Sequence, residues 1–165
     1  GEILIKGENV MIGYWNNPID TDKTLKDGWL YTGDIGYFDD GFLKITDRKK
    51  DILITPGGDN ISPVKIENDL TKTEFIEQAL VYGDNKPFLV ALLVINDDEK
   101  NINSEIIKNE IEKINKELSK IEKIKKYIVI DKQFSIENGL MTPTLKLKIY
   151  KIIEEYKNEL EKLYN

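Results

Sequence analysis

The sequence predicts a mixed α/β (α+β) fold, with a β-rich opening segment at residues 1–47 and a small domain at 48–165 in which helices flank a short sheet. In the opening segment, short apolar runs alternate with glycines, a pattern typical of strands joined by turns. In the second part, strand-like apolar runs alternate with segments that space Ile and Leu as a helix does. The 165 residues are 40% hydrophobic and 33% charged, which indicates a globular chain with a core.

The opening segment is expected to consist of strands and one short helix. Asp39, Asp40 and Gly41 predict a hairpin turn, because glycine accepts the positive φ that tight hairpin turns require. A short helix is predicted over 20–25, after Pro18. The predicted strands are 2–6, 10–15, 29–31, 35–38 and 42–45.

The second part follows a charged joint at 47–51, which holds no apolar residue and is a candidate pivot. Ser62 and Pro63 predict the start of a helix that runs to about residue 70, because serine caps helices and proline suits the first helical position. Loops are expected at 55–60 and 83–85. Strands are predicted at 52–54, 78–82, 88–95 and 127–130, and helices at 105–118 and along Ile149, Ile152, Ile153, Tyr156, Leu160 and Leu163.

The composition excludes several classes of site. The chain has neither cysteine nor histidine, which excludes disulfides, thiol nucleophiles, Ser-His pairs and the usual zinc sites, so no bound metal is expected. A formal net charge of -6 argues against a nucleic-acid partner. No apolar run is long enough to cross a bilayer, and the N-terminus lacks the basic flank of a secretory signal, so a cytoplasmic protein is expected.

Two charged residues have the chemistry of a nucleotide site. Arg48 is the one arginine in a chain that otherwise uses lysine, and its planar fork can hold two oxygens at once. Asp34 follows Gly33 at the end of a predicted strand, where a carboxylate can accept hydrogen bonds from two vicinal hydroxyls of a ribose. Each residue also has a plainer reading, Arg48 as part of a surface turn and Asp34 as part of a common Thr-Gly-Asp turn.

Several motifs follow one another in a definite order: Gly1-Glu2-Ile3, Gly13-Tyr14-Trp15, Gly28-Trp29-Leu30-Tyr31-Thr32-Gly33-Asp34, Asp40-Gly41-Phe42-Leu43, Asp47-Arg48-Lys49-Lys50-Asp51, Gly57-Gly58-Asp59-Asn60-Ile61-Ser62-Pro63 and Ile66-Glu67. In this order and spacing they resemble the adenylate-forming superfamily, which includes acyl-CoA synthetases, adenylation domains of peptide synthetases and luciferases. The resemblance covers most of residues 1–95. The segment 138–146 is also similar to the closing motif of long-chain fatty acid–CoA ligases.

The resemblance implies the C-terminal part of an AMP-forming ligase that works in two steps. A carboxylic acid attacks the α-phosphate of Mg-ATP to give acyl-AMP and pyrophosphate, and the thiol of CoA then displaces AMP. Residues 1–47 would end a large domain that binds ATP and the acid, and 48–165 would form a mobile C-terminal domain that rotates between the steps. The complete enzyme would use ATP, Mg²⁺ and CoA as co-substrates.

The same resemblance assigns roles to single residues. Asp34 and Arg48 correspond to the ribose contacts, Lys50 falls at the hinge, and Gly57 and Gly58 fall in the loop that faces the CoA pantetheine. Two glycines leave no side chain to obstruct a thin ligand and expose backbone amides. The alternative reading of the two glycines is an ordinary hairpin turn.

The chain departs from the family at the catalytic lysine, which many members carry in a Pro-x-x-x-x-Gly-Lys run. Here Thr144 takes the aligned position and Lys146 lies two residues later. In an extended segment residues two apart point to the same side, so Lys146 is the first candidate and Lys148 the second. The alternative is that these lysines form a basic first turn of the last helix.

No Gly/Ser/Thr-rich phosphate loop and no apolar wall for an acyl chain are present in the sequence. In the resembling enzymes both belong to the N-terminal domain of the same polypeptide, so this chain alone is expected to be inactive. Two alternatives stay open: a related ligase for another acid or for acyl carrier protein, and a free-standing module that binds CoA or a partner. The lysines of the last two helices read as a solvated face, with peripheral membrane contact as the minor alternative.

Overall fold

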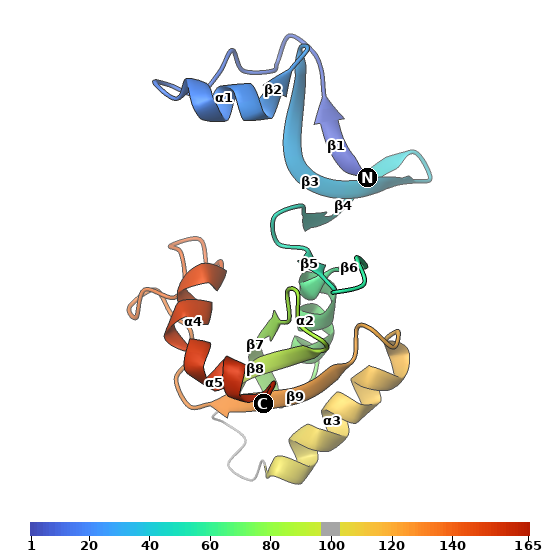
Figure 1. Cartoon of the computed structure of the whole chain (residues 1–165), viewed down its shortest axis with the longest axis vertical. Coiled ribbons are helices and arrows are strands. Elements are labelled where there is room, and N and C mark those ends of the chain that lie inside the picture. The colour runs from blue at the N-terminus through green and yellow to red at the C-terminus, as the bar shows by residue number, and fades with distance from the viewer. Residues whose placement is uncertain (97–102) are drawn as a thin grey trace. The chain divides into compact units, whose positions relative to one another are not determined.

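The computed structural model describes residues 1–96 and 103–165, which form two compact units. Unit 1 is Gly1–Ile52 and unit 2 is Leu53–Asn165. Sheets and helices alternate along the chain, so the predicted mixed α/β fold is confirmed (Figure 1). No helix of the described residues is long and apolar enough to span a membrane. The predicted boundary between residues 47 and 48 concerns domains of the complete enzyme and stays a prediction.

Unit 1 is an antiparallel sheet built around one long strand, β3, to which the other three strands pair. Asp40 (φ 48°) and Gly41 (φ 82°) both take positive φ between β3 and β4, which confirms the predicted hairpin. The strands predicted at 29–31 and 35–38 are one strand, because Gly33 takes a positive φ of 72° without ending it. The elements are β1 (Glu2–Ile5), α1 (Pro18–Thr24), β2 (Leu25–Lys26), β3 (Trp29–Asp39) and β4 (Phe42–Arg48).

The strand predicted at 10–15 is wrong. These residues form turns and bends that lead into α1, which begins at Pro18 with Asn17 as its N-cap. The backbone N–H of Tyr14 donates to Thr21 Oγ1 at 2.9 Å, so a helix side chain takes a bond that a neighbouring strand would otherwise take. An apolar run becomes a strand only where a partner strand lies beside it.

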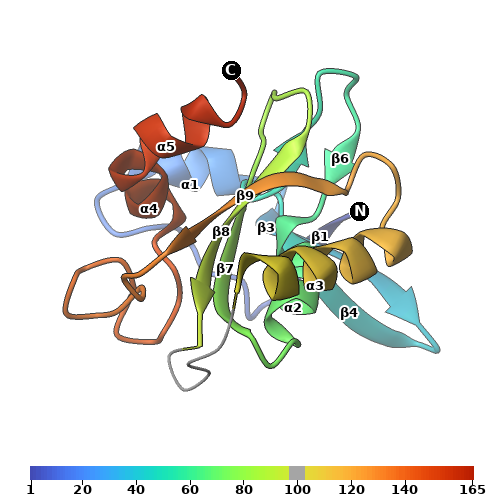
Figure 2. The ribbon, with the colours of Figure 1, turned by 90° about the horizontal axis from the view of Figure 1, so that it is seen from below.

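Unit 2 is a three-stranded sheet with helices on both faces (Figure 2). The central strand β8 pairs antiparallel with β7 and parallel with β9. Helices α2 and α3 cover one face and α4 and α5 the other, and a separate two-stranded hairpin, β5–β6, precedes α2. The elements are β5 (Leu53–Ile54), β6 (Asn60–Ile61), α2 (Pro63–Thr71), β7 (Ile76–Tyr82), β8 (Leu89–Ile95), α3 (Ser104–Glu117), β9 (Ile124–Ile130), α4 (Ile149–Glu155) and α5 (Lys157–Lys162).

Two hydrophobic cores lie on the two faces of this sheet. Along β8, Leu89, Ala91 and Leu93 face the first core, and Val90, Leu92 and Val94 face the second. A strand buried on both faces reads as a continuous apolar run in the sequence, as β8 does.

The helix start predicted at Ser62 and Pro63 is confirmed, since Ser62 Oγ accepts a hydrogen bond from the backbone N–H of Lys65 at 3.3 Å. The single final helix predicted from Ile149 onward is wrong, because the segment consists of α4 and α5. Tyr156 separates them with φ -102° and ψ 16°, outside the helical region. Neither glycine nor proline marks this break, so the helical spacing of the apolar residues continues across it in the sequence.

Candidate functional site

The two predicted ribose contacts lie side by side in unit 1. Asp34 of β3 and Arg48 of β4 are directly opposite in the antiparallel ladder, and Arg48 Nε lies 3.0 Å from Asp34 Oδ1. The Asp34 side chain is 24% exposed and that of Arg48 is 58% exposed. No other hydrogen bond of either side chain occurs within residues 1–96 and 103–165, so most of the polar groups of the pair can reach a ligand.

Glu2 and Lys49 hold the backbone around this pair. Glu2 Oε1 accepts a hydrogen bond from the Gly33 N–H at 3.2 Å, and Lys49 Nζ lies 2.9 Å from Glu2 Oε2. The hydrogen bond from Lys49 is the main reason why the pKa of Glu2 is lowered. Lys49 N–H also donates to the Gly33 carbonyl at 2.7 Å. Sequence reasoning missed both residues, because they lie 47 positions apart and no local pattern links them.

Lys50 lies in an exposed turn directly after β4. The turn is closed by a hydrogen bond from the Asp51 N–H to the Arg48 carbonyl at 2.9 Å. Unit 1 ends two residues later, at Ile52. The role of Lys50 as a hinge stays a prediction.

Gly57 and Gly58 form the tip of the β5–β6 hairpin in unit 2. The backbone N–H of Thr55 donates to the Asp59 carbonyl and that of Gly58 to the Thr55 carbonyl, each at 2.9 Å. Gly58 has a φ of 87°, and a Cβ at this position would meet no atom within 4 Å. Locally the segment is therefore a hairpin turn with an open tip, and its contact with pantetheine stays a prediction.

Asp84 and Asn85 anchor the base of this hairpin to the turn between β7 and β8. Asp84 Oδ1 accepts a hydrogen bond from the Ile54 N–H at 2.9 Å, and the Asn85 N–H donates to the Ile54 carbonyl at 2.8 Å. The turn thus fixes where the Gly57-Gly58 tip begins. Sequence analysis identified 83–85 only as a connection, since the contact spans 30 positions.

Lys146 lies in a tight loop before α4, and the extended segment assumed for it is wrong. The Thr142 N–H donates to the Lys146 carbonyl at 2.8 Å, and the Lys146 N–H donates to Thr142 Oγ1 at 3.0 Å. Leu145 has a φ of 59°, so Thr144 and Lys146 are not two steps along one pleat. Lys148 occupies the N-cap position of α4, so neither lysine belongs to its first turn. Lys146 is exposed and Lys148 half-buried.

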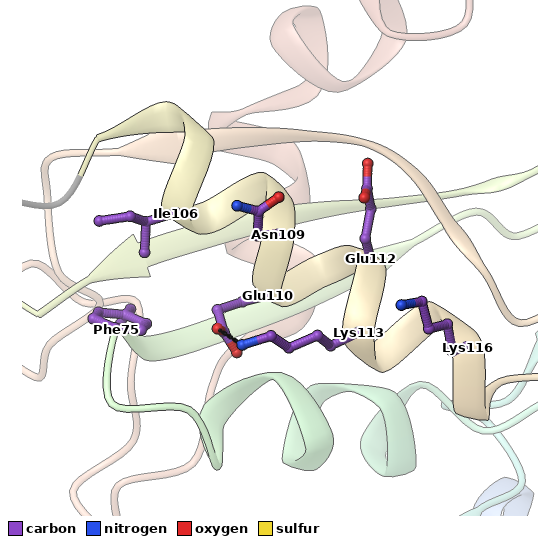
Figure 3. Close-up of a pocket in the computed structure, with 7 residues that line it drawn as sticks. All are labelled: Phe75, Ile106, Asn109, Glu110, Glu112, Lys113 and Lys116. Atoms are coloured by element: carbon purple, nitrogen blue, oxygen red, sulfur yellow. Dashed lines mark hydrogen bonds and ion pairs between the residues drawn. The ribbon is translucent and has the colours of Figure 1, made fainter.

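A shallow groove of about 390 Å³ runs along α3 and was not anticipated (Figure 3). Charged side chains of α3 border it, and Lys113 pairs with Glu110, three residues earlier on the same helix, at 2.5 Å. The lining residues are Phe75, Ile106, Asn109, Glu110, Glu112, Lys113 and Lys116. None of the predicted site residues borders the groove.

The predicted site residues thus fall in both units. Asp34, Arg48 and Lys50 belong to unit 1, and the Gly57-Gly58 tip and Lys146 belong to unit 2. In the described part of the chain, no three or more acidic side chains converge as a metal site would require. The chemistry available is hydroxyl binding by the Asp34–Arg48 pair and a positive charge at Lys146.

Comparison with known sequences identifies a family and a set of relatives. Residues 50–165 match the family described as the AMP-binding enzyme C-terminal domain. The long-chain-fatty-acid–CoA ligase FadD15 of Mycobacterium tuberculosis is 36% identical over all of this chain, which covers 31% of that protein. Long-chain-fatty-acid–CoA ligase 5 of Mus musculus is 38% identical over 99% of this chain, which covers 28% of that protein. The chain therefore spans about a third of the length of these relatives.

Solved structures of similar fold are adenylating enzymes. The adenylation domain of a carboxylate reductase from Mycobacterium chelonae has a TM-score of 0.87 and 29% identity, over 99% of this chain and 27% of that one. The A domain of carboxylic acid reductase from Segniliparus rugosus, solved with AMP and a co-purified carboxylic acid, has a TM-score of 0.89 and 25% identity, over 99% of this chain and 28% of that one.

Proposed function

This chain belongs to the AMP-binding enzyme C-terminal domain family, and from that premise we propose that it serves as the C-terminal part of a long-chain fatty acid–CoA ligase. The complete enzyme would join a fatty acid to AMP with release of pyrophosphate, and then transfer the acyl group to the thiol of CoA. The observation that carries the proposal is the Asp34–Arg48 pair, 3.0 Å apart on adjacent strands. A structural relative with this fold was solved with AMP and a carboxylic acid.

The Asp34–Arg48 pair suits the nucleotide ribose in both steps. The carboxylate of Asp34 accepts hydrogen bonds from the ribose hydroxyls. The guanidinium of Arg48 holds that carboxylate in place and donates a further hydrogen bond to a ribose oxygen. Because ATP, acyl-AMP and AMP share this sugar, the same contact serves every intermediate. Mg²⁺ would travel with the triphosphate, and the described residues of this chain offer no cluster to hold it, so we assign it no ligand here.

Lys146 suits the first step, in which charge develops on the α-phosphate while pyrophosphate leaves. A positive charge there stabilises the transition state most where water is excluded. The resembling motif places glycine directly before its lysine, and Leu145 before Lys146 takes the left-handed backbone that glycine favours. This local geometry supports Lys146 over Lys148. In the second step a turn at Lys50 would bring the Gly57-Gly58 tip toward the pantetheine of CoA.

The test replaces the matching 31% of FadD15 by this chain and measures the two half-reactions separately. We expect the chimera to exchange pyrophosphate into ATP with fatty acids and to form thioesters from supplied acyl-AMP, whereas the isolated chain releases no pyrophosphate. Lys146→Ala should slow adenylation by roughly a hundredfold and spare thioester formation. Lys148→Ala is the matched control.

Two results would contradict the proposal. One is turnover by the isolated chain. The other is a chimera that melts cooperatively but exchanges no pyrophosphate with any fatty acid. Supplying acyl carrier protein instead of CoA in the second half-reaction shows which of the two thiol acceptors the chimera uses.

A further inference from the structure

Leu145 has a backbone conformation that its side chain disfavours. Five non-glycine residues of the described chain take a left-handed φ, and four of them, Asn16, Asp27, Asp40 and Asn85, are of the types that tolerate it through short polar side chains. Leu145, with a φ of 59°, is the exception. A bulky apolar residue in this region marks strain that the surrounding structure must impose.

The loop around Leu145 imposes this conformation through its hydrogen bonds. Leu145 N–H donates to the Thr142 carbonyl at 2.9 Å, and the Thr142 N–H donates to the Lys146 carbonyl at 2.8 Å. This is a three-residue hairpin loop, whose last residue is normally a left-handed glycine. Met141 and Leu147 pair at its base and pack on the second core, so the loop cannot relax by shifting its ends.

The side chain of Leu145 packs little against the rest of unit 2. It is 69% exposed, and among the large hydrophobic residues described in unit 2 only Tyr150, in the first turn of α4, is comparably exposed. A single exposed leucine is ordinary. A leucine that is both exposed and strained, directly before Lys146, costs stability at a place where glycine or asparagine would not.

We propose that Leu145 is a positioning residue for Lys146, and this inference rests on the function proposed above. In the adenylating arrangement the Leu145 side chain packs on an apolar surface of the preceding part of the ligase. The rigid turn transmits that contact to the next residue, so that Lys146 is held at the α-phosphate. This chain covers about a third of the length of its relatives. The surface that Leu145 contacts therefore belongs to the part of the ligase that corresponds to the other two thirds.

The first experiment measures strain in the isolated chain by thermal melting. Leu145→Gly and Leu145→Asn accept the left-handed φ, so each should raise the melting temperature by a few degrees, whereas Leu145→Ala should not. A lower melting temperature for both Leu145→Gly and Leu145→Asn would overturn the strain argument.

The second experiment measures both half-reactions in the FadD15 chimera. Leu145→Gly, Leu145→Asn and Leu145→Ala should each lower the kcat of adenylation by roughly tenfold, with the KM for ATP and thioester formation unchanged, because each removes the apolar contact. Leu145→Met keeps an apolar side chain of similar volume and should restore most of the rate. A merely structural role would not give this combination of a more stable chain and a slower first step.

The controls separate this inference from the proposed function. Suppose that the unsubstituted chimera adenylates fatty acids and that Lys146→Ala slows this step. If the Leu145→Gly chimera then adenylates at the full rate, the positioning role of Leu145 is overturned and the ligase assignment stands. If the folded chimera does not adenylate, or Lys146→Ala has no effect, it is the proposed function or its lysine that fails.

Discussion

The two units of this chain use their apolar residues in opposite ways. Every buried hydrophobic residue of the described chain lies between Ile61 and Leu160, in unit 2, where two cores form on the faces of the sheet. Unit 1 leaves large apolar side chains in solvent, with Trp15 at 92% exposure and Phe42 at 76%. It is held by strand ladders and by the ion pairs around Gly33.

The difference teaches that the Asp34–Arg48 pair, proposed above to bind the ribose, lies on a sheet without a hydrophobic core of its own. Each ladder hydrogen bond contributes only about 0.5–1.5 kcal/mol net, because the unfolded chain makes hydrogen bonds with water instead. A sheet needs an apolar face packed against another layer. We infer that the apolar side chains of unit 1 pack against another part of the proposed ligase, whereas unit 2 has two cores of its own.

The sharpest way to break this comparison is to separate the units. We expect a fragment of residues 53–165 to melt cooperatively, because it keeps both cores. A fragment of residues 1–52 should show no cooperative transition by circular dichroism. A cooperative melt of the 1–52 fragment would show that unit 1 is stable by itself.

Single truncations in the two units should differ by several kcal/mol. Leu92→Ala removes a fully buried side chain from the second core and should lower the free energy of unfolding by about 2–5 kcal/mol in urea titrations. Phe42→Ala in the isolated chain should change it by less than about 0.5 kcal/mol, since the ring is exposed. If Phe42→Ala destabilises the complete ligase but not the isolated chain, the ring of Phe42 packs against another part of the ligase.

Substituting Asp34, the proposed ribose contact in unit 1, should affect both half-reactions, unlike Lys146→Ala in unit 2. Asp34→Ala should weaken binding of ATP and of acyl-AMP by about 1.5–3 kcal/mol, or tenfold to a hundredfold, because a charged hydrogen-bond acceptor is lost. Isothermal titration of the FadD15 chimera with each nucleotide measures both affinities. Unchanged affinities would remove Asp34 from the site.

Restricting the backbone at Lys50, near the end of unit 1, should affect the two half-reactions differently. Lys50→Pro fixes φ near -65° and also restricts Lys49, so we expect thioester formation to slow several-fold more than adenylation. Pyrophosphate exchange and CoA attack on supplied acyl-AMP measure the two steps. Lys50→Ala is the control for the side chain, and equal slowing of both steps by Lys50→Pro would mean that Lys50 is not the pivot.

The smallest expected effect concerns the packing of α5 in unit 2. Glu161 accepts hydrogen bonds from Lys86 Nζ at 2.6 Å and from the Tyr82 hydroxyl at 2.9 Å, and the bond from Lys86 is the main reason why its pKa is lowered from the usual 4.5. Burial, followed by the bond to Glu161, raises the pKa of Tyr82 to about 12.

Because the folded-state pKa of Glu161 lies below the unfolded value, its contribution is present above about pH 4.5 and is lost as the pH falls through the lowered pKa. Glu161→Gln should therefore lower the melting temperature at pH 7 and have a smaller effect at pH 3. Glu154→Gln on α4 is the control, because Glu154 makes no ion pair in the described part of the chain. A difference that stays constant with pH would exclude this linkage.

Much of the fold could be predicted because its signals are local. The cap and proline at Ser62 and Pro63 and the Asp40-Gly41 turn each depend on neighbouring residues only, and both were correct. The errors arose where non-local contacts decided the outcome. The run at 10–15 found no partner strand, and the last helix broke at Tyr156 although its spacing continued.

The sequence by itself determined the family and the identity of the candidate residues, because the order of motifs and the single arginine are properties of the chain as written. Only the tertiary structure decided that Arg48 lies against Asp34, that Asp84 anchors the Gly57-Gly58 hairpin, and that Leu145 is strained beside Lys146. The physical reason is that these features depend on contacts that no local sequence pattern specifies. Cross-strand register, side-chain anchors and the φ of a closed loop depend on hydrogen bonds that form only when segments distant in sequence, or the two ends of a loop, come together.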